Sequence, residues 1–303
     1  MAGSHEFAHG WVTPALAYGV SVLGSLLGLV CTGRARDGRT RAGRADWLTL
    51  AAISIGGTGI WLMHFLAMIG FAVDGTDVRF TVGPTAVSAV LAIAVVGVGL
   101  VILGTGRPRA YRVLAGGVFT GLGVAGMHYT GMAAMRVQGT IGYDPTLVTA
   151  SVLIAVVAAT AALWFTIVAR NLLVITGAAL IMGIAVNGMH YVGMRALQVR
   201  LDQVHNQAEG IDLTMALPII AGLAGAMVVV LLYATLSLPT EEERMLPMAP
   251  YPAGSGSGGS MAASPWTPEP SPEMGAAAGR RPTADAGAHR APASSVELRR
   301  SSY

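Results

Sequence analysis

Long apolar segments dominate this chain and most constrain what it can fold into. Each is about 17–25 residues long, which is enough for a helix to cross the hydrocarbon core of a bilayer. They fall near residues 11–32, 47–70, 82–104, 113–135, 146–169, 172–195 and 214–238. Only 12% of the 303 residues are charged, about half the share in an average soluble protein. We therefore predict an all-α membrane protein with seven transmembrane helices.

Composition divides the chain into three parts. Residues 1–10 are polar and mixed, and the apolar segments fill 11–238. From 239 to 303 Gly, Ser, Pro and Ala prevail, and such a segment cannot bury enough apolar area to offset its ordering entropy. We expect an extracytoplasmic N-terminus (1–10), a seven-helix membrane domain (11–238) and a disordered cytoplasmic tail (239–303).

The arginines give the expected orientation in the membrane, since the chain has no lysine. Of the 13 arginines before residue 239, nine lie in the loops after the first, third and fifth apolar segments: Arg34, Arg36, Arg39, Arg41, Arg44, Arg107, Arg109, Arg112 and Arg170. Basic residues favour the cytoplasmic side. We expect a multi-pass protein of the plasma membrane with its N-terminus outside and its C-terminus inside. The basic charge then reflects topology, and no nucleic-acid partner is expected.

Three similar motifs mark an internal repeat: "LMHFLAM" (62–68), "GMHYTGM" (126–132) and "GMHYVGM" (188–194). Their histidines lie 64 and 62 residues apart in even-numbered segments, so their helices run in one direction and the histidines share one depth near the outer face. Ser21, Ser88 and Ser151 recur upstream in the odd-numbered segments. We predict three tandem two-helix repeats followed by an unpaired seventh helix. Such repeats form pseudo-symmetric bundles with sites at their interface, which should bring the three histidines together.

The motif residues suggest a soft metal site. Each histidine has a methionine directly before it and another four residues later, and a spacing of four stacks side chains on one helix face. The candidate ligands are His64, Met68, His128, Met132, His190, Met194, Met63, Met127 and Met189. Thioether and imidazole suit copper, whereas calcium and magnesium prefer oxygen. Copper is the expected cofactor. The alternative is a purely structural role, with methionines filling gaps. In either case we expect the motif glycines 126, 131, 188 and 193 to allow close helix contact.

The tetrapeptide "MHYT" at 127–130, with "MHFL" at 63–66 and "MHYV" at 189–192, resembles the bacterial MHYT domain over about residues 9–238. The resemblance implies an integral membrane sensor with its motifs near the outer face. It also implies copper coordination by the Met-His pairs of the motifs and perception of O2, CO or NO. Family proposals sometimes add a cysteine ligand, but Cys31 falls at the opposite end of its helix. Many relatives carry cyclic-dinucleotide or histidine-kinase domains, so we expect a separate cytoplasmic signalling partner here.

Other functions leave weaker signals in the sequence. A copper-handling transporter or delivery protein is the main alternative, although the inner halves of the helices offer mostly Ala, Val, Leu, Ile and Gly. We expect no enzyme, because no catalytic constellation or output enzyme domain is seen. The absence of lysine excludes a retinal Schiff base. A scaffold role remains open.

Overall fold

The computed structural model describes residues 4–5, 10–38, 40–104 and 109–201, together with 211–212, 222, 225, 228–229 and 232–233. The predicted tail (239–303) lies outside these residues, as does most of the predicted seventh helix (214–238). The described positions between 222 and 233 are helical. Within the described part of the chain, six helical spans are long and apolar enough to cross a membrane. The all-α membrane class is therefore confirmed, and the seventh helix stays a prediction.

The six spans follow the predicted segments closely. The third and sixth segments, 82–104 and 172–195, coincide with α4 and α7. The second span is composite, because α2, η1 and α3 follow one another without a loop. The helices are α1 (Val12–Asp37), α2 (Arg41–Ala52), η1 (Ile53–Leu62), α3 (Met63–Met68), α4 (Val82–Gly104), α5 (Ala110–Ala133), α6 (Pro145–Val168) and α7 (Leu172–Arg195).

Local signals fix the tight hairpin between α6 and α7. The Asp144 side chain caps α6 by accepting from backbone N–H groups of its first turn, and Pro145 occupies the first helical position. The Asn171 side chain caps α7 in the same way. Arg36 of α1 donates to the carbonyl of Ala169 over 2.8 Å, which satisfies a backbone acceptor at the end of α6. α6 and α7 therefore form a tight hairpin with both of its helix ends capped.

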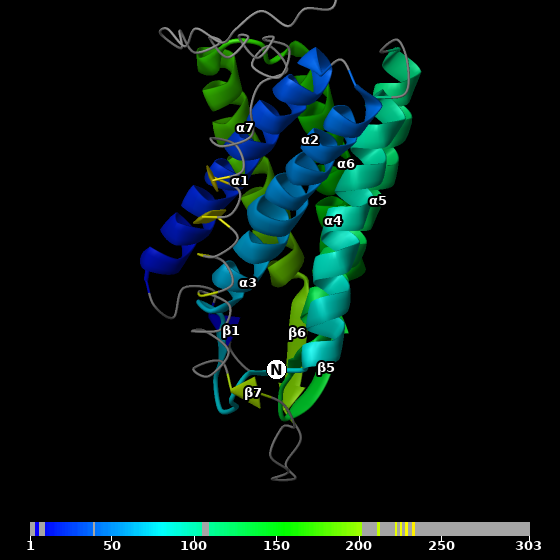
Figure 1. Cartoon of the computed structure of the whole chain (residues 1–303). Helices are drawn as coiled ribbons and strands as arrows, with labels where there is room; N and C mark the ends of the chain where they lie inside the picture. Colours follow the sequence, from blue (N-terminus) through cyan, green and yellow to red (C-terminus); the bar gives the residue numbers. More distant parts are fainter. Residues whose placement is uncertain are drawn as a thin grey trace, which may run out of the picture. The chain divides into compact units, whose positions relative to one another are not determined.

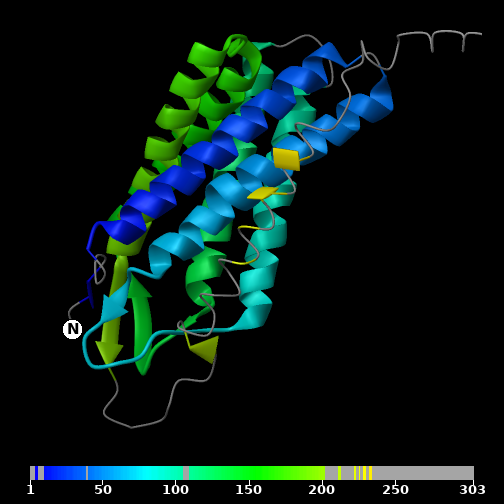
Figure 2. The same cartoon turned by 60° about the vertical axis from the view of Figure 1, so that its left-hand side comes forward.

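The six spans close into a ring (Figures 1 and 2). α1 packs against η1 and α7, α4 packs against η1 and α5, and α6 packs against α5 and α7. Helices that carry a motif (α3 at the end of η1, α5 and α7) thus alternate with α1, α4 and α6. Ser21, Ser88 and Ser151 are fully buried on those three helices. The ring therefore has the threefold repeated arrangement that the sequence predicted.

The π-helix η1 was not predicted. Its glycines allow neighbouring helices to approach at backbone distance. A Cβ on Gly56 would lie 2.6 Å from the carbonyl oxygen of Ala92 on α4, and one on Gly24 of α1 would lie 2.4 Å from the backbone nitrogen of Gly59. π-helical turns are rare and often mark functional sites. This one ends directly before Met63, at the first motif.

Short strands gather where α3, α5 and α7 end (Figures 1 and 2), and we call this the strand end of the bundle. β3 pairs antiparallel with β4 and β7, β5 with β6, and β1 with β2. The sheets thus tie together the loops that follow the three motif helices. The strands are β1 (Ser4–His5), β2 (Ala72–Val73), β3 (Arg79–Phe80), β4 (Met135–Arg136), β5 (Gly139–Tyr143), β6 (Leu197–Leu201) and β7 (Ile211–Asp212).

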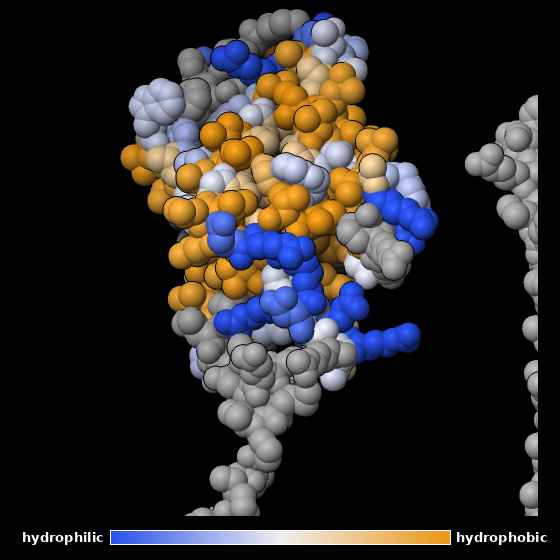
Figure 3. Space-filling view, turned by 90° about the horizontal axis from the view of Figure 1, so that it is seen from above, coloured by the Kyte–Doolittle hydropathy of each residue, from blue (hydrophilic) through white to orange (hydrophobic). Residues whose placement is uncertain are grey.

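The outer surface of the ring is apolar. Large side chains such as Leu153 (61% exposed), Val157 (69%) and Ile184 (63%) point away from the bundle. Figure 3 looks down from the opposite, arginine-bearing end and shows blue hydrophilic side chains beside broad orange apolar surfaces. Contiguous apolar surface of this extent is unusual in water-soluble monomers and suits lipid. The chain is a multi-pass membrane protein, and its orientation stays a prediction.

Candidate metal centre

The three motif histidines meet at the strand end of the ring, and we call them the histidine trio. His64 on α3, His128 on α5 and His190 on α7 are each at most 1% exposed. The Nδ1 atom of His64 lies 3.0 Å from that of His190 and 3.2 Å from that of His128. The ring centroids are 4.9, 5.0 and 5.3 Å apart, with planes inclined by 73° to 89°. The predicted convergence is confirmed.

The nitrogen geometry fits a shared cation. An imidazole nitrogen carries either one proton or one lone pair, so a proton between two of these atoms leaves the third facing them without a complementary partner. Two nitrogens that bind one ion tetrahedrally at about 2.0 Å lie about 3.3 Å apart, close to the distances here. Among the described residues, the trio is the group of His, Cys, Asp or Glu side chains whose ligand atoms lie close enough together to hold a metal.

Two motif glycines make room for the imidazoles. A Cβ on Gly131 would lie 2.4 Å from Nε2 of His64, and one on Gly193 would lie 2.3 Å from Nε2 of His128. Each of these glycines therefore seats the histidine of another repeat, a role beyond the helix contact that we expected. The expectation is wrong for Gly188, where a Cβ would meet nothing within 4 Å.

An aromatic ring follows each histidine and packs edge-on against it. The centroid distances are 4.9 Å for Phe65, 5.0 Å for Tyr129 and 5.1 Å for Tyr191, each measured to the preceding histidine. Such contacts contribute about 0.5–1.5 kcal/mol beyond their buried area. The "HF" and "HY" pairs of the motifs therefore restrict how the imidazoles can turn.

Two of the repeated serines, Ser88 and Ser151, form hydrogen bonds to side chains of the motif-bearing spans, a role that the sequence did not reveal. Ser151 donates to the carbonyl of Val148 over 2.8 Å, so the Tyr129 hydroxyl, 2.7 Å away, donates to Ser151 Oγ. Since its hydroxyl points at α6, Tyr129 does not bond an imidazole in this structure.

In the first repeat, a different side chain makes the hydrogen bond to the repeated serine of the neighbouring helix. Phe65 on α3 has no hydroxyl, and Trp61, four residues earlier in η1, donates its Nε1–H to Ser88 Oγ over 3.1 Å. Ser88 in turn donates to the carbonyl of Thr85 over 2.7 Å. The signal in the sequence was the loss of the tyrosine together with a tryptophan four residues before it.

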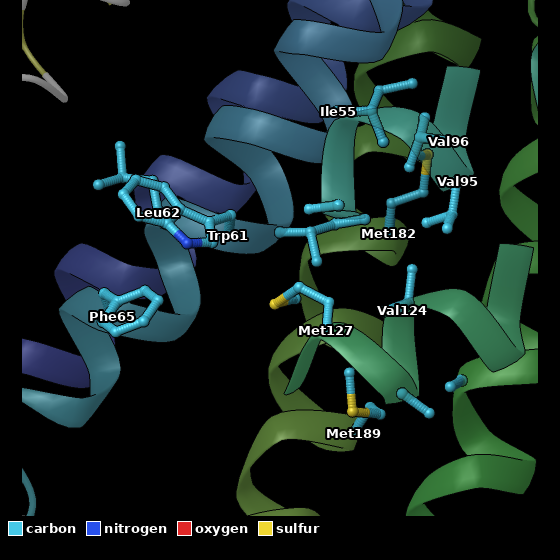
Figure 4. Packing of buried hydrophobic residues seen from close by; sticks show 14 of the residues in the cluster. Ile55, Trp61, Leu62, Phe65, Val95, Val96, Val124, Met127, Met182 and Met189 are labelled. Atoms are coloured by element: carbon cyan, nitrogen blue, oxygen red, sulfur yellow. The ribbon is translucent and has the colours of Figure 1, made fainter. Parts of the chain in front are cut away.

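The six motif methionines lie on the same helices as the trio, and all are buried. Met63 packs with Ala17 and Ala67, whereas the other five belong to the main apolar core. Met127 and Met189 lie among the core side chains drawn in Figure 4. Burial of all six agrees with a functional layer and equally with filling of space, so ligation by their sulfur atoms stays a prediction.

Aromatic side chains of the strands cover the trio's neighbours. Phe80 on β3 packs on Phe65 with centroids 6.1 Å apart, and Tyr143 on β5 packs on Tyr129 at 5.7 Å. Burial, reinforced by the nearby Tyr129, raises the pKa of Tyr143 above its ordinary value. The phenol thus stays uncharged over a wide pH range, which suits a cap over a buried site.

Comparison with known proteins follows the same repeat. The family model MHYT, described as "Bacterial signalling protein N terminal repeat", matches residues 57–116, 121–179 and 183–246. The first two matches each pair a motif helix with the helix after it, and the third runs from α7 over the predicted seventh segment. This frame leaves the first helix unpaired, whereas our frame left the seventh segment unpaired.

Curated relatives share this region only. The bifunctional diguanylate cyclase/cyclic di-GMP phosphodiesterase MucR of Pseudomonas aeruginosa is 38% identical over 64% of this chain and 29% of its own length. The cyclic di-GMP phosphodiesterase NbdA of the same species is 39% identical over 50% of this chain and 20% of its own. The signaling protein YkoW of Bacillus subtilis is 32% identical over 52% and 20%. This chain therefore spans less than a third of these relatives.

No solved structure matches the chain. The three family matches together cover more than half of it and contain all three motif histidines. With six apolar spans, the repeated motifs and the ring that joins them, the chain belongs to the MHYT family of bacterial membrane signalling proteins.

Proposed function

We propose that this protein is a membrane sensor whose histidine trio holds one copper ion and perceives a diatomic gas (O2, CO or NO) or a change of redox state. The observation that carries the proposal is that the buried His64 Nδ1 lies within hydrogen-bonding distance of the Nδ1 atoms of both His128 and His190. The relatives are named as signalling proteins, two of them acting on cyclic di-GMP. We propose that the signal passes to a cytoplasmic signalling partner.

Copper suits the chemistry of the donors. Three imidazoles form a neutral set, and Cu(I) has the affinity for thioethers that would recruit the buried methionines at the +4 positions of the motifs: Met68, Met132 and Met194. Bound Cu(I) would supply one-electron redox chemistry and an open coordination position. Three histidines also form catalytic zinc sites, so the identity of the metal is the point that an experiment must decide.

The residues of the chain would convert ligand binding into helix movement. Each imidazole belongs to a different motif helix, and two of them rest on a glycine of another repeat. A change in the separation of the three nitrogens therefore has to move α3, α5 and α7 relative to one another. A ligand shifts such an equilibrium only through different affinities for the two arrangements, and here those arrangements would differ in the spread of the trio.

Metal content is the direct test. Protein purified anaerobically in detergent should contain one copper per chain, measured by elemental analysis, and X-ray absorption should show nitrogen ligands. The triple variant His64→Ala, His128→Ala, His190→Ala should contain none, while His289→Ala in the predicted tail should match the parent chain. Copper retained by the triple variant, or zinc in place of copper in the parent chain, would contradict the proposal.

Copper transport is the alternative function and predicts copper uptake into proteoliposomes. The side chains below the trio argue against it, since Ile60, Val124 and Val186 offer no ligand to a charged ion. Uptake that depends on the trio would favour transport over sensing. Since the curated relatives match this chain only in the MHYT region, we propose no enzymatic activity for it.

A further inference from the structure

A cavity of about 50 Å³ lies inside the ring, and we call it the axial cavity. All six spans contribute to its wall. Ile60, Val124 and Val186 line it, and each stands four residues before a histidine of the trio, or about one turn of 5.4 Å away along its helix. Figure 4 shows Val124, Met182 and Met189 among the apolar side chains of this region. The cavity therefore lies directly beneath the candidate metal centre.

The lining of the axial cavity gives a water molecule little to bond. Most of it is aliphatic, and the hydroxyls that reach it belong to Ser25, Thr120 and Thr166. Thr120 already donates to the carbonyl of Val95 over 3.3 Å, and Thr166 to that of Leu163 over 2.6 Å. Apolar cavities of this kind stay dry and take up small apolar guests such as xenon.

Alanines of α6 and α7 form much of the wall of the cavity. Small side chains line it there: Ala155, Ala158, Ala159, Ala162 and Ala185. Ala158, Ala162 and Ala185 are only half-buried, so the same residues border both the cavity and the outside of the ring. An apolar molecule dissolved in the bilayer would meet this wall without crossing water or a charged group.

We propose that the axial cavity binds a small apolar molecule of about two heavy atoms, a diatomic gas, which enters from the bilayer between α6 and α7 and is held beneath the histidine trio. The cavity's size, dryness and position carry this assignment. Only its link to a metal-bound gas rests on the function proposed above.

Xenon is the probe, and methionine methyl groups report its position. Met182 and Met189 line the cavity, so in metal-free protein labelled with ¹³C-methyl methionine their NMR signals should shift under xenon pressure. Helium at equal pressure controls for compression, and Met182→Leu and Met189→Leu assign the signals. Xenon dissolved in the detergent would not act on these two methyl groups alone. For xenon bound in the cavity, the other methionine signals should therefore stay in place. Absence of a xenon-specific shift at both methyl groups would overturn the proposal.

A matched pair of variants on α7 localises the site. Val186→Phe fills the cavity beneath His190 and should weaken the xenon response at least about tenfold. Ile184→Phe adds a ring on the exposed face, where Ile184 is 63% exposed, and should change the response less than about twofold. If Val186→Phe does not fold, Ala159→Leu fills the cavity from α6, with Val157→Leu as its exposed control. Equal responses within a pair would overturn the assignment to this cavity.

The two proposals fail separately. Xenon binding to metal-free protein that never acquires copper would retain the axial cavity and remove the sensor's metal. In copper-loaded protein, Val186→Phe should slow CO binding at least about fivefold at unchanged copper content, whereas Ile184→Phe should not. An unchanged CO rate in Val186→Phe would refute the cavity as a holding site for the trio's ligand.

Discussion

The trio and the axial cavity are two consecutive layers of one ring, and their packing is opposite. In the trio layer, polar side chains converge until their nitrogens are 3.0–3.2 Å apart. One turn away, Ile60, Val124 and Val186 face a cavity of about 50 Å³. The same helices thus build a closed polar layer and a hollow apolar one. The difference implies that the first layer binds an ion through fixed donor atoms, whereas the second binds a guest by enclosing it in a cavity. The two layers should therefore respond to different substitutions.

The largest expected effect comes from removing His64. Its Nδ1 is the atom that lies within 3.2 Å of both other histidines. His64→Ala should weaken Cu(I) binding by at least about a hundredfold, because even residues that only support a metal ligand contribute 10- to 100-fold. Competition with a colorimetric Cu(I) chelator measures the change. Xenon binding in the cavity should persist in the same variant, and its loss would show that the layers are not independent.

Adding one methyl group to the closed layer should have the next largest effect. In Gly193→Ala the new Cβ would lie 2.3 Å from Nε2 of His128, so overpacking should cost about 1–3 kcal/mol and lower copper affinity about tenfold. Gly188→Ala on the same helix meets nothing within 4 Å. It should bind copper as the parent does and gain up to about 1 kcal/mol from helix propensity. Thermal unfolding and copper titration compare the two, and equal behaviour would contradict the seating role of Gly193.

Replacing methionine with leucine removes the thioether sulfur and tests whether the methionines belong to the closed layer. The methionines at +4 share a helix face with their histidines, so replacing all of them (Met68→Leu, Met132→Leu, Met194→Leu) should weaken Cu(I) binding about fivefold through loss of a soft ligand. The matched control replaces those before the histidines: Met63→Leu, Met127→Leu, Met189→Leu. It should change affinity less than about twofold. A larger effect of the control set would assign the sulfur ligand to the other position.

Much of the fold follows from local information in the sequence. The lengths of apolar runs located α4 and α7, and the spacing of the motifs with Ser21, Ser88 and Ser151 indicated the repeated unit. Convergence of the histidines followed from symmetry, because three equivalent helices in a ring present equivalent faces to one axis. These features depend on one helix at a time or on the repeat itself.

Features that depend on contact between particular helices could not be predicted from the sequence. The need for glycine at 131 and 193 is visible only once an imidazole of another repeat is placed against it. The π-helix depends on the approach of η1 to α1 and α4, and the strands depend on loops far apart in the chain. The axial cavity is likewise a property of facing side chains, since Val124 and Val186 read as ordinary apolar residues. Only one of these contacts left a signal that closer inspection could have found: Phe65 replaces the tyrosine of the other motifs, and Trp61 stands four residues before it.

The smallest expected effect distinguishes positioning from binding within the closed layer. Tyr129→Phe removes the hydroxyl that bonds Ser151 at 2.7 Å but keeps the ring against His128, as Phe65 does beside His64. Stability should fall by about 1 kcal/mol, the net contribution of one hydrogen bond. A double-mutant cycle with Ser151→Ala should recover most of that value as coupling, and copper affinity should change less than about threefold. A loss above about tenfold would mean that the phenol itself reaches the ion, in which case the hydroxyl's bond to α6 would have to break on binding.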